Sequence, residues 1–169
     1  LAMPTHPADL PGWHAHHQVA KTAEGALVGI MPSYIKMNSH GDFLRDWSWA
    51  TAYEQLGKPY FPKLISGLPH TPASGPRFLV NTEYGVEDIR QQLIARAKEL
   101  VTEQQLSSWH VALPADEEID SLRANGLLVS HDVQFQWRNR GYGDFDGYLA
   151  AFPSEKRRKV RAERRKVAE

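Results

Sequence analysis

Two residues carry side chains that could accept a proton during catalysis, Asp46 and His70. Asp46 precedes Trp47 and Trp49 at the start of a predicted helix, where a carboxylate commonly serves as an N-cap or first-turn anion. Burial among the indoles would instead raise the pKa of Asp46 and suit it for proton transfer. His70 follows a predicted strand in a proline-rich loop, where its imidazole is either a general base or a turn residue bonded to the backbone.

We predict a strand over residues 129–138, and polar and aromatic side chains alternate along it from Gln134 onward. One face of this strand would carry Gln134, Gln136 and Arg138, and the other Phe135, Trp137 and the following Asn139. Two amides and a guanidinium are better suited to recognising peptide groups or a carboxylate than to breaking bonds. The alternative is a solvated sheet face without a ligand.

The C-terminal segment 156–166 has eight Lys or Arg among eleven residues, and its only apolar stripe is Val160 with Val167. A helix of this composition gains little from burial, so it either docks on the acidic remainder of the chain or binds a polyanion. The candidate polyanion-binding residues are Arg157, Arg158, Arg164 and Arg165.

Other common sites find no support in the sequence. The crowded histidines His14, His16 and His17 lack a carboxylate or cysteine at a ligand spacing, so no metal site is expected. Neither the dinucleotide-binding pattern G-x-G-x-x-G nor the P-loop pattern occurs, and the nucleophile elbow G-x-S-x-G is also missing.

The composition is that of a soluble globular protein, with 41% hydrophobic and 24% charged residues in 169 positions. No apolar stretch approaches the ~20 residues of a membrane span, and the lack of cysteine fits a cytoplasmic protein. The zero net charge hides an asymmetry, because residues 155–169 hold eight Lys or Arg against three Glu. We therefore expect a domain over residues 1–152, followed by a basic helix over 153–169.

The pattern of elements predicts an α/β fold, a mixed β-sheet flanked by helices that begins with a hairpin. The predicted strands are 18–23, 26–36, 62–68, 107–113 and 129–138. The predicted helices are 46–56, 86–106, 116–125, 144–152 and the basic C-terminal segment. The helix 86–106 should pack on the sheet through Ile89, Leu93 and Leu100.

Four motifs together carry a family resemblance: D-W-x-W-A-x-A-Y from Asp46, L-P-x-T-P-x-x-G-P-R from Leu68, Q-F-x-W-x-N-R-G-Y from Gln134 and S-x-K-R-R-x-x-R-x-E-R-R-K from Ser154. From about Gly12 to its end, the chain resembles the FemAB-like, peptidoglycan biosynthesis/recognition family of the GNAT N-acyltransferase superfamily. The resemblance implies a GNAT-like fold. Family members have two such halves, so the chain corresponds to one half without its first segment, and 153–169 leads into the second.

The resemblance implies N-acyl transfer: an acyl or aminoacyl group moves to an amine or peptide acceptor, from acyl-CoA or from aminoacyl-tRNA, which makes tRNA a candidate partner. Asp46 or His70 would handle the proton. Positioning would fall to Arg77, Gln136 and Asn139, and cleft walls to Trp47, Trp49 and Trp137. By itself the chain is expected to be inactive. The alternative is a non-catalytic module that binds peptide or a cell-wall precursor.

Overall fold

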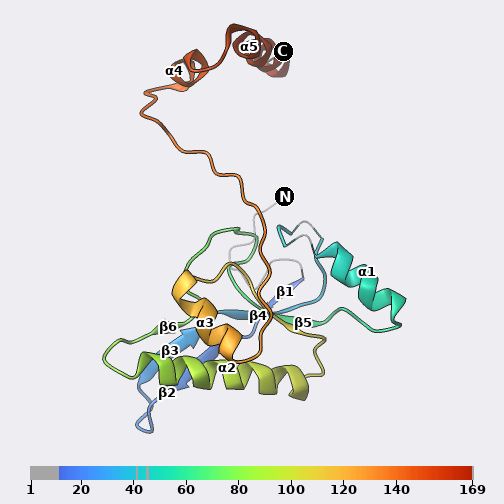
Figure 1. The fold of residues 1–169 in the computed structure, drawn as a ribbon, viewed down its shortest axis with the longest axis vertical. Coiled ribbons are helices and arrows are strands. Elements are labelled where there is room, and N and C mark those ends of the chain that lie inside the picture. The colour runs from blue at the N-terminus through green and yellow to red at the C-terminus, as the bar shows by residue number, and fades with distance from the viewer. Residues whose placement is uncertain (1–11, 41, 45, 169) are drawn as a thin grey trace. The chain divides into compact units, whose positions relative to one another are not determined.

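The computed structural model describes residues 12–40, 42–44 and 46–168, which form helices and strands in the order shown in Figure 1. The chain divides into an N-terminal unit, residues 1–129, and a C-terminal unit, residues 130–169. The division lies earlier than the 152/153 boundary that the charge pattern suggested. The reason is that the short helix before the basic segment packs against that segment, as described below.

The N-terminal unit has two sheets where one was expected. The first has the order β1-β4-β5-β7, formed by β1 (Trp13–Ala15), β4 (Ser33–Lys36), β5 (Lys63–Ser66) and β7 (Trp109–Val111). Its pairs are antiparallel except β5 with β7, which is parallel. The second has the order β2-β3-β6, all antiparallel, formed by β2 (Gln18–Lys21), β3 (Leu27–Met31) and β6 (Leu79–Val80). The mixed α/β class is therefore confirmed.

The predicted hairpin is present, because β2 pairs with β3 around a turn that contains Gly25 at φ 91°. That backbone conformation favours glycine, which explains the residue type at the turn. The predicted strand 26–36 is not continuous, since Pro32 separates β3 from β4 and the two belong to different sheets. Proline has no N–H to donate, so the ladder is interrupted at the position where the chain changes sheet.

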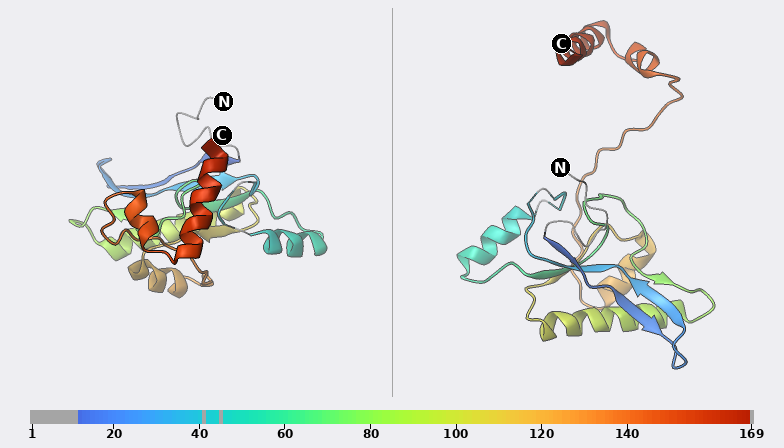
Figure 2. Two further views of the ribbon diagram at one scale, coloured as in Figure 1. Left: turned by 90° about the horizontal axis from the view of Figure 1, so that it is seen from above. Right: turned by 180° about the vertical axis from the view of Figure 1, so that it is seen from behind.

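Helix α2 (Val86–Glu103) supplies the centre of the core, as its apolar spacing predicted. It packs on β2 and β3, and Figure 2 shows it running along these strands. Its buried residues are Ile89, Leu93, Ile94, Ala97 and Leu100. The approach is close at Gly29 of β3, where a Cβ atom would lie 2.6 Å from Cγ2 of Ile89. Glycine is therefore required there for packing.

Two shorter helices complete the N-terminal unit. Helix α1 (Trp47–Gln55) lies within the predicted range 46–56 and buries none of its residues. Helix α3 (Asp116–Ala124) packs against α2 and buries Leu122 and Glu118.

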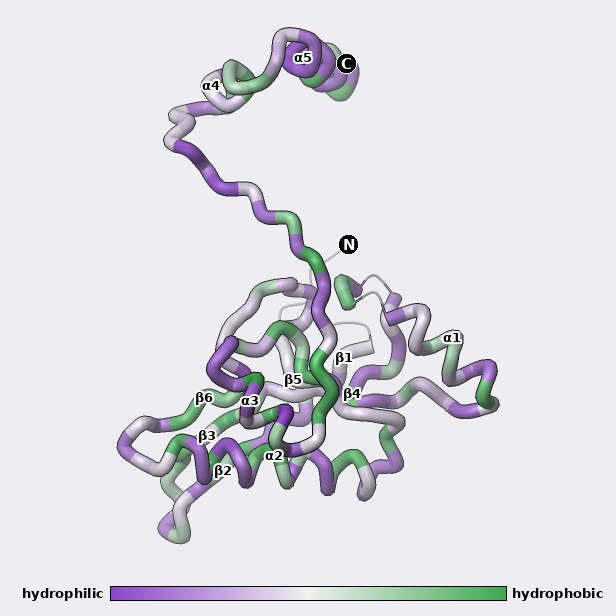
Figure 3. Tube along the Cα trace, viewed as in Figure 1, coloured by the Kyte–Doolittle hydropathy of each residue, from purple (hydrophilic) through white to green (hydrophobic). Residues whose placement is uncertain are grey.

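The C-terminal unit begins with an extended segment and ends with two helices, α4 (Phe145–Ala150) and α5 (Ser154–Ala168). The strand predicted over 129–138 is wrong, since these residues pair with no strand in the part of the chain that is described. They are exposed throughout, and hydrophilic and hydrophobic residues alternate along them in Figure 3. Alternation expresses β propensity, but a strand also needs a partner backbone, which the described chain does not supply.

Candidate functional site

The N-terminal unit buries a cluster of charged side chains where β4 ends and β5 begins. Lys36 and Lys63 are direct partners in the β4–β5 register, and both are 0% exposed. The ammonium of Lys36 pairs with Asp42, and that of Lys63 pairs with Asp46. Two positive and two negative groups thus neutralise one another, which is the condition for burying charge at tolerable cost.

Hydroxyl groups complete this cluster. The Tyr60 hydroxyl donates to Asp46 Oδ2 at 3.1 Å and accepts from Lys63 Nζ at 2.8 Å. Lys36 Nζ donates to Ser39 Oγ, also at 2.8 Å. The two lysines are therefore fixed by partners from the segment between β4 and β5. These contacts hold both ends of that segment against the sheet.

The cluster shifts the pKa of several of its members. Burial favours the neutral form of Asp46, but hydrogen bonds from Lys63 and Ser39 and the charges of both lysines outweigh it and lower its pKa to about 2. Burial and the negative charge of Asp46 raise the pKa of Tyr60. Burial lowers the pKa of Lys63 despite Asp46. At neutral pH, Asp46 is thus a carboxylate with little tendency to take up a proton.

His110 of β7 lies beside this cluster, with its ring centroid 6.2 Å from that of Tyr60. Burial and then the positive charge of Lys63 lower its pKa to about 4. Its Nε2 is 3.0 Å from Ser108 Oγ. A neutral imidazole at pH 7 is thus held next to the charged groups.

The side chains of Trp47 and Trp49 do not surround the carboxylate of Asp46 in the structure. Asp46 lies at the N-cap position of α1, but its side chain makes no cap hydrogen bond because Lys63 and Tyr60 hold it. Trp47 and Trp49 are 52% and 58% exposed, so the indoles do not enclose the carboxylate. The alternative interpretation, a pKa of Asp46 raised by burial among the indoles, is therefore wrong.

His70 and Arg77 both belong to the structure of the proline-rich loop. His70 is exposed and has φ 53° in a turn that Thr71 closes with a hydrogen bond to the Leu68 carbonyl. Its position fits the turn-residue interpretation.

Arg77 is buried, and its guanidinium donates to the carbonyls of Ala112 at 2.8 Å and Leu113 at 2.9 Å, and also to those of Ala73 and Pro76. Those bonds fix the proline-rich loop rather than a ligand.

The sequence analysis missed Lys36, Lys63, Tyr60 and Asp42. Lysines at strand ends are usually solvated, so their burial could not be read from type or spacing. The same holds for Glu118, whose buried carboxylate accepts N–H bonds from Arg77, Phe78 and Ala115. A buried carboxylate with three backbone donors orders the loop before β6.

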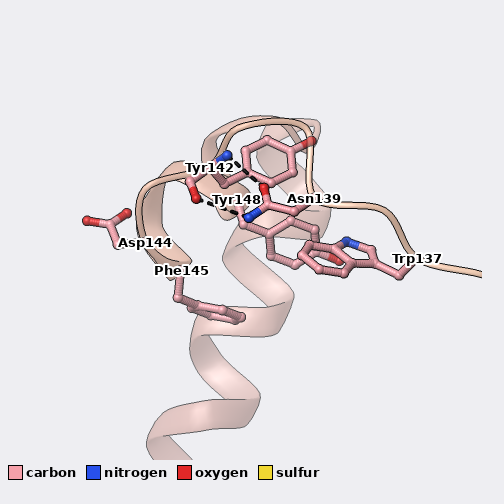
Figure 4. A pocket seen from close by; sticks show the side chains of 6 residues that line it. All are labelled: Trp137, Asn139, Tyr142, Asp144, Phe145 and Tyr148. Atoms are coloured by element: carbon pink, nitrogen blue, oxygen red, sulfur yellow. Dashed lines mark hydrogen bonds between the residues drawn. The ribbon is translucent and has the colours of Figure 1, made fainter.

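A second candidate site is a pocket of about 400 Å³ in the C-terminal unit. Figure 4 shows its lining, formed by Trp137, Asn139, Tyr142, Asp144, Phe145 and Tyr148. Tyr148 is the centre, because its ring contacts those of Trp137, Tyr142 and Phe145 at centroid distances of 5.8, 5.4 and 5.8 Å. Mostly aromatic walls with a few polar atoms are typical of ligand pockets.

The polar side chains of this pocket also shape it. Asn139 Oδ1 accepts from the N–H groups of Gly141 and Tyr142, at 3.0 and 2.8 Å, which closes the turn before α4. Asp144 is the N-cap of α4 and accepts from Gly147 N at 2.7 Å. Two predicted binding residues, Trp137 and Asn139, thus come together here. Gln136 lies outside the pocket, on the exposed segment.

The predicted polyanion-binding residues lie along α5, where Arg158, Arg164 and Arg165 are exposed and Arg157 is half-buried. Helix α5 contacts α4 through an ion pair of Arg161 with Asp146 at 3.4 Å. The Arg164 guanidinium also lies 4.3 Å from the Phe145 ring centroid. These contacts explain why α4 belongs with α5.

Within the residues described, no group of three or more His, Asp or Glu side chains could hold a metal ion. No helix among them is long and apolar enough to cross a bilayer.

The protein is thus of mixed α/β class, and its basic C-terminal unit contains an aromatic pocket. It belongs to the FemAB-like family, whose model, described as peptidoglycan biosynthesis/recognition, matches residues 7–169. Membership indicates a role in peptidoglycan biosynthesis or recognition. Comparisons with curated proteins and with solved structures found no match.

Proposed function

We propose that this protein recognises the peptide part of a cell-wall precursor and that residues 129–138 bind it as an added strand. The observation that carries the proposal is the extended course of this segment, which is exposed and lies outside both sheets of the described chain (Figure 1). An extended backbone offers N–H and C=O groups that an extended peptide can pair with. The alternating side chains would then select among peptides.

The side chains of this segment fit such a ligand. Gln136 Nε2 lies 3.5 Å from Gln134 Oε1, so the two amides occupy the same side of the backbone, as the period of two requires. Amides both donate to and accept from peptide groups, and Arg138 can pair with a carboxylate. On the other side, Phe135 is 95% exposed and offers apolar surface.

Proline substitutions test the strand-addition proposal, because proline removes one backbone N–H. Successive N–H groups point to opposite edges of a strand, so a peptide added along one edge uses either that of Phe135 or that of Gln136. Binding of a soluble muropeptide to the full chain would be measured by calorimetry. We expect one of Phe135→Pro and Gln136→Pro to weaken binding by roughly 5- to 10-fold and the other to leave it nearly unchanged.

Circular dichroism of both proline variants should match that of the unchanged chain, since no ladder is broken. Equal affinities for both proline variants and the unchanged chain, or no muropeptide binding at all, would refute the strand-addition proposal.

The second candidate function is N-acyl transfer within the GNAT superfamily, in the cytoplasm, and the cluster around Lys63 favours it. In this reaction an amine attacks the carbonyl carbon of a thioester or ester and forms an amide, the bond from carbon to sulfur or oxygen breaks, and the thiol or alcohol leaves with the proton that the amine gives up. Perturbed pKa values of neighbouring groups, such as those of Asp46, Tyr60 and Lys63, cluster at functional sites. The donor would be acyl-CoA or aminoacyl-tRNA.

Transfer would be assayed with acetyl-CoA and with aminoacyl-tRNA against a panel of amines, on this chain and on a longer protein with both halves. We expect turnover from the longer protein alone. In that protein, Tyr60→Phe should lower turnover by about 10²-fold or more, because the hydroxyl links Asp46 to Lys63. Robust turnover by this chain, or full activity of the variant, would place the chemistry elsewhere.

A further inference from the structure

The aromatic pocket of the C-terminal unit is bordered by cations of α5. Arg164 lies over Phe145, which lines the pocket. Lys156 Nζ is 4.7 Å from the centroid of Phe152, and the Phe152 ring packs on that of Tyr148 at 4.8 Å. Positive charge is thus held at the rim of a pocket whose walls are rings.

Three arginines continue this rim along one face of α5. Arg157, Arg161 and Arg164 are spaced by four and then three residues, which places them on the same side of a helix. Contacts of Arg161 with Asp146 and of Arg164 with Phe145 show that this side is turned toward α4. The pocket therefore opens beside a row of guanidinium groups.

The charge of the unit decides which class of ligand this arrangement favours. Aromatic pockets can bind ammonium groups, but residues 130–169 hold ten Lys or Arg against six Asp or Glu. This excess repels a cation and attracts an anion. Of the acidic residues, Asp144 and Asp146 are already engaged with α4 and α5.

The aromatic rings of the pocket indicate that the ligand also has a flat, stacking group. Trp137 is 64% exposed and meets Tyr148 at an interplanar angle of 87°, so much of the indole is left open to a flat partner. The Asn139 amide oxygen is engaged by two backbone N–H groups. Stacking on aromatic faces together with phosphate contacts from Arg is how proteins hold unpaired nucleotides.

We propose that the aromatic pocket binds the nucleobase of a phosphorylated ligand, with Trp137 stacking on the base and Arg157, Arg161 and Arg164 contacting its phosphates. The shared chemistry is that of a nucleotide, whether free or at the end of a single-stranded RNA. This inference goes beyond the proposed peptide binding and does not depend on it, because it uses the side chains of Trp137 and α5 and not the backbone of residues 129–138.

Calorimetry on the full chain would compare uridine diphosphate and adenosine 3′,5′-bisphosphate with inorganic pyrophosphate, which has the charge but no base. A labelled single-stranded RNA oligonucleotide provides the polymer arm. We expect each nucleotide to bind at least about 10-fold more tightly than pyrophosphate, since stacking adds to the phosphate contacts. An RNA that binds more tightly than both nucleotides identifies an RNA end as the source, and equal affinities identify a free nucleotide.

Two variants separate the base from the phosphates. Trp137→Ala should weaken nucleotide binding about 10-fold and leave pyrophosphate binding unchanged, whereas Tyr84→Ala, an exposed aromatic of the N-terminal unit, is the matched control. Arg164→Gln should weaken both ligands and reduce the salt dependence of binding, with Arg123→Gln of α3 as its control. Both changed residues are exposed, so folding should be preserved.

Pyrophosphate affinity equal to that of the nucleotides, an unaffected Trp137→Ala variant, or no binding of any probe would overturn the nucleotide proposal. Muropeptide binding measured on the same variants keeps the two proposals apart, since Arg164→Gln should not alter it.

Discussion

Lys36 and Lys63 face one another across β4 and β5 with no exposed surface, and each is held by an aspartate from the segment between the two strands. Like charges in register would repel, so the arrangement depends on Asp42 and Asp46 being present and ionised. The cluster therefore couples the pairing of β4 and β5 to the conformation of the segment that connects them.

Removing one acidic partner should destabilise the fold strongly. In Asp46→Asn, the ammonium of Lys63 remains buried without its counter-ion, and we expect a loss of about 3–5 kcal/mol in the free energy of unfolding. Urea denaturation measures it. The control is Asp120→Asn, whose side chain is 92% exposed in its pair with Arg123 and should cost at most about 1 kcal/mol. Similar values for both variants would contradict the burial of the cluster.

The free energy of unfolding should decrease as the pH is lowered through the range in which His110 takes up a proton. Its pKa is about 4 in the folded protein, below its ordinary value, so the unfolded chain binds the proton first as the pH drops. The contribution is fully present above about pH 6.5 and is lost progressively toward pH 4. His110→Gln should flatten this part of the curve, whereas the exposed His131→Gln should not. Urea denaturation between pH 7 and pH 4 would show it.

A second loss of stability should occur at lower pH. The pKa of Asp46 is about 2 in the folded protein, below its ordinary value, so its stabilising contribution is present above about pH 4 and is lost as the pH falls to 2. Asp46→Asn should lack this step. Unfolding curves that remain parallel for the variant and the unchanged chain down to pH 2 would contradict the Lys63 pairing.

The contact between β3 and α2 makes a prediction about packing. In Gly29→Ala the new methyl group would overlap Ile89, and we expect a loss of about 1–3 kcal/mol. Ile89→Ala in the same chain should recover part of it, because the overlap is removed, so the two effects are not additive. Gly143→Ala, where no atom lies within 4 Å, is the control for glycine replacement itself. Additive losses in the double variant would exclude the overlap.

Substitutions in the exposed segment 129–138 should change the free energy of unfolding little, whereas substitutions in a core strand should lower it strongly. Phe135→Ser should change the free energy of unfolding by less than about 0.5 kcal/mol, since the ring is almost fully exposed. Ile65→Ala in β5, at 0% exposure, should cost about 2–5 kcal/mol. Thermal unfolding compares the two. A large effect at Phe135 would mean that residues 129–138 pack in a sheet.

Elements whose signals are local could be predicted from the amino-acid sequence. The spacing of Ile89, Leu93 and Leu100 predicts α2 and its buried face, because helical periodicity fixes which residues share a side. Gly25 and its neighbours predict the hairpin for a similar reason, since a tight turn needs a residue that tolerates positive φ. The family motifs likewise stand in the sequence and agree with the family match.

The side-chain partners of Asp46 and Arg77 could not be predicted in this way, because they depend on the folded chain. Asp46 has the sequence of a helix cap, but Lys63, which is 17 positions away, binds its carboxylate and lowers its pKa. Arg77 has the type of a ligand-binding residue, yet carbonyls up to 36 positions away engage its guanidinium. Residues 129–138 have strand propensity without a partner strand. In each case the outcome depends on groups brought together by folding, and their distance along the chain leaves no periodic or local signal from which the contact could be predicted.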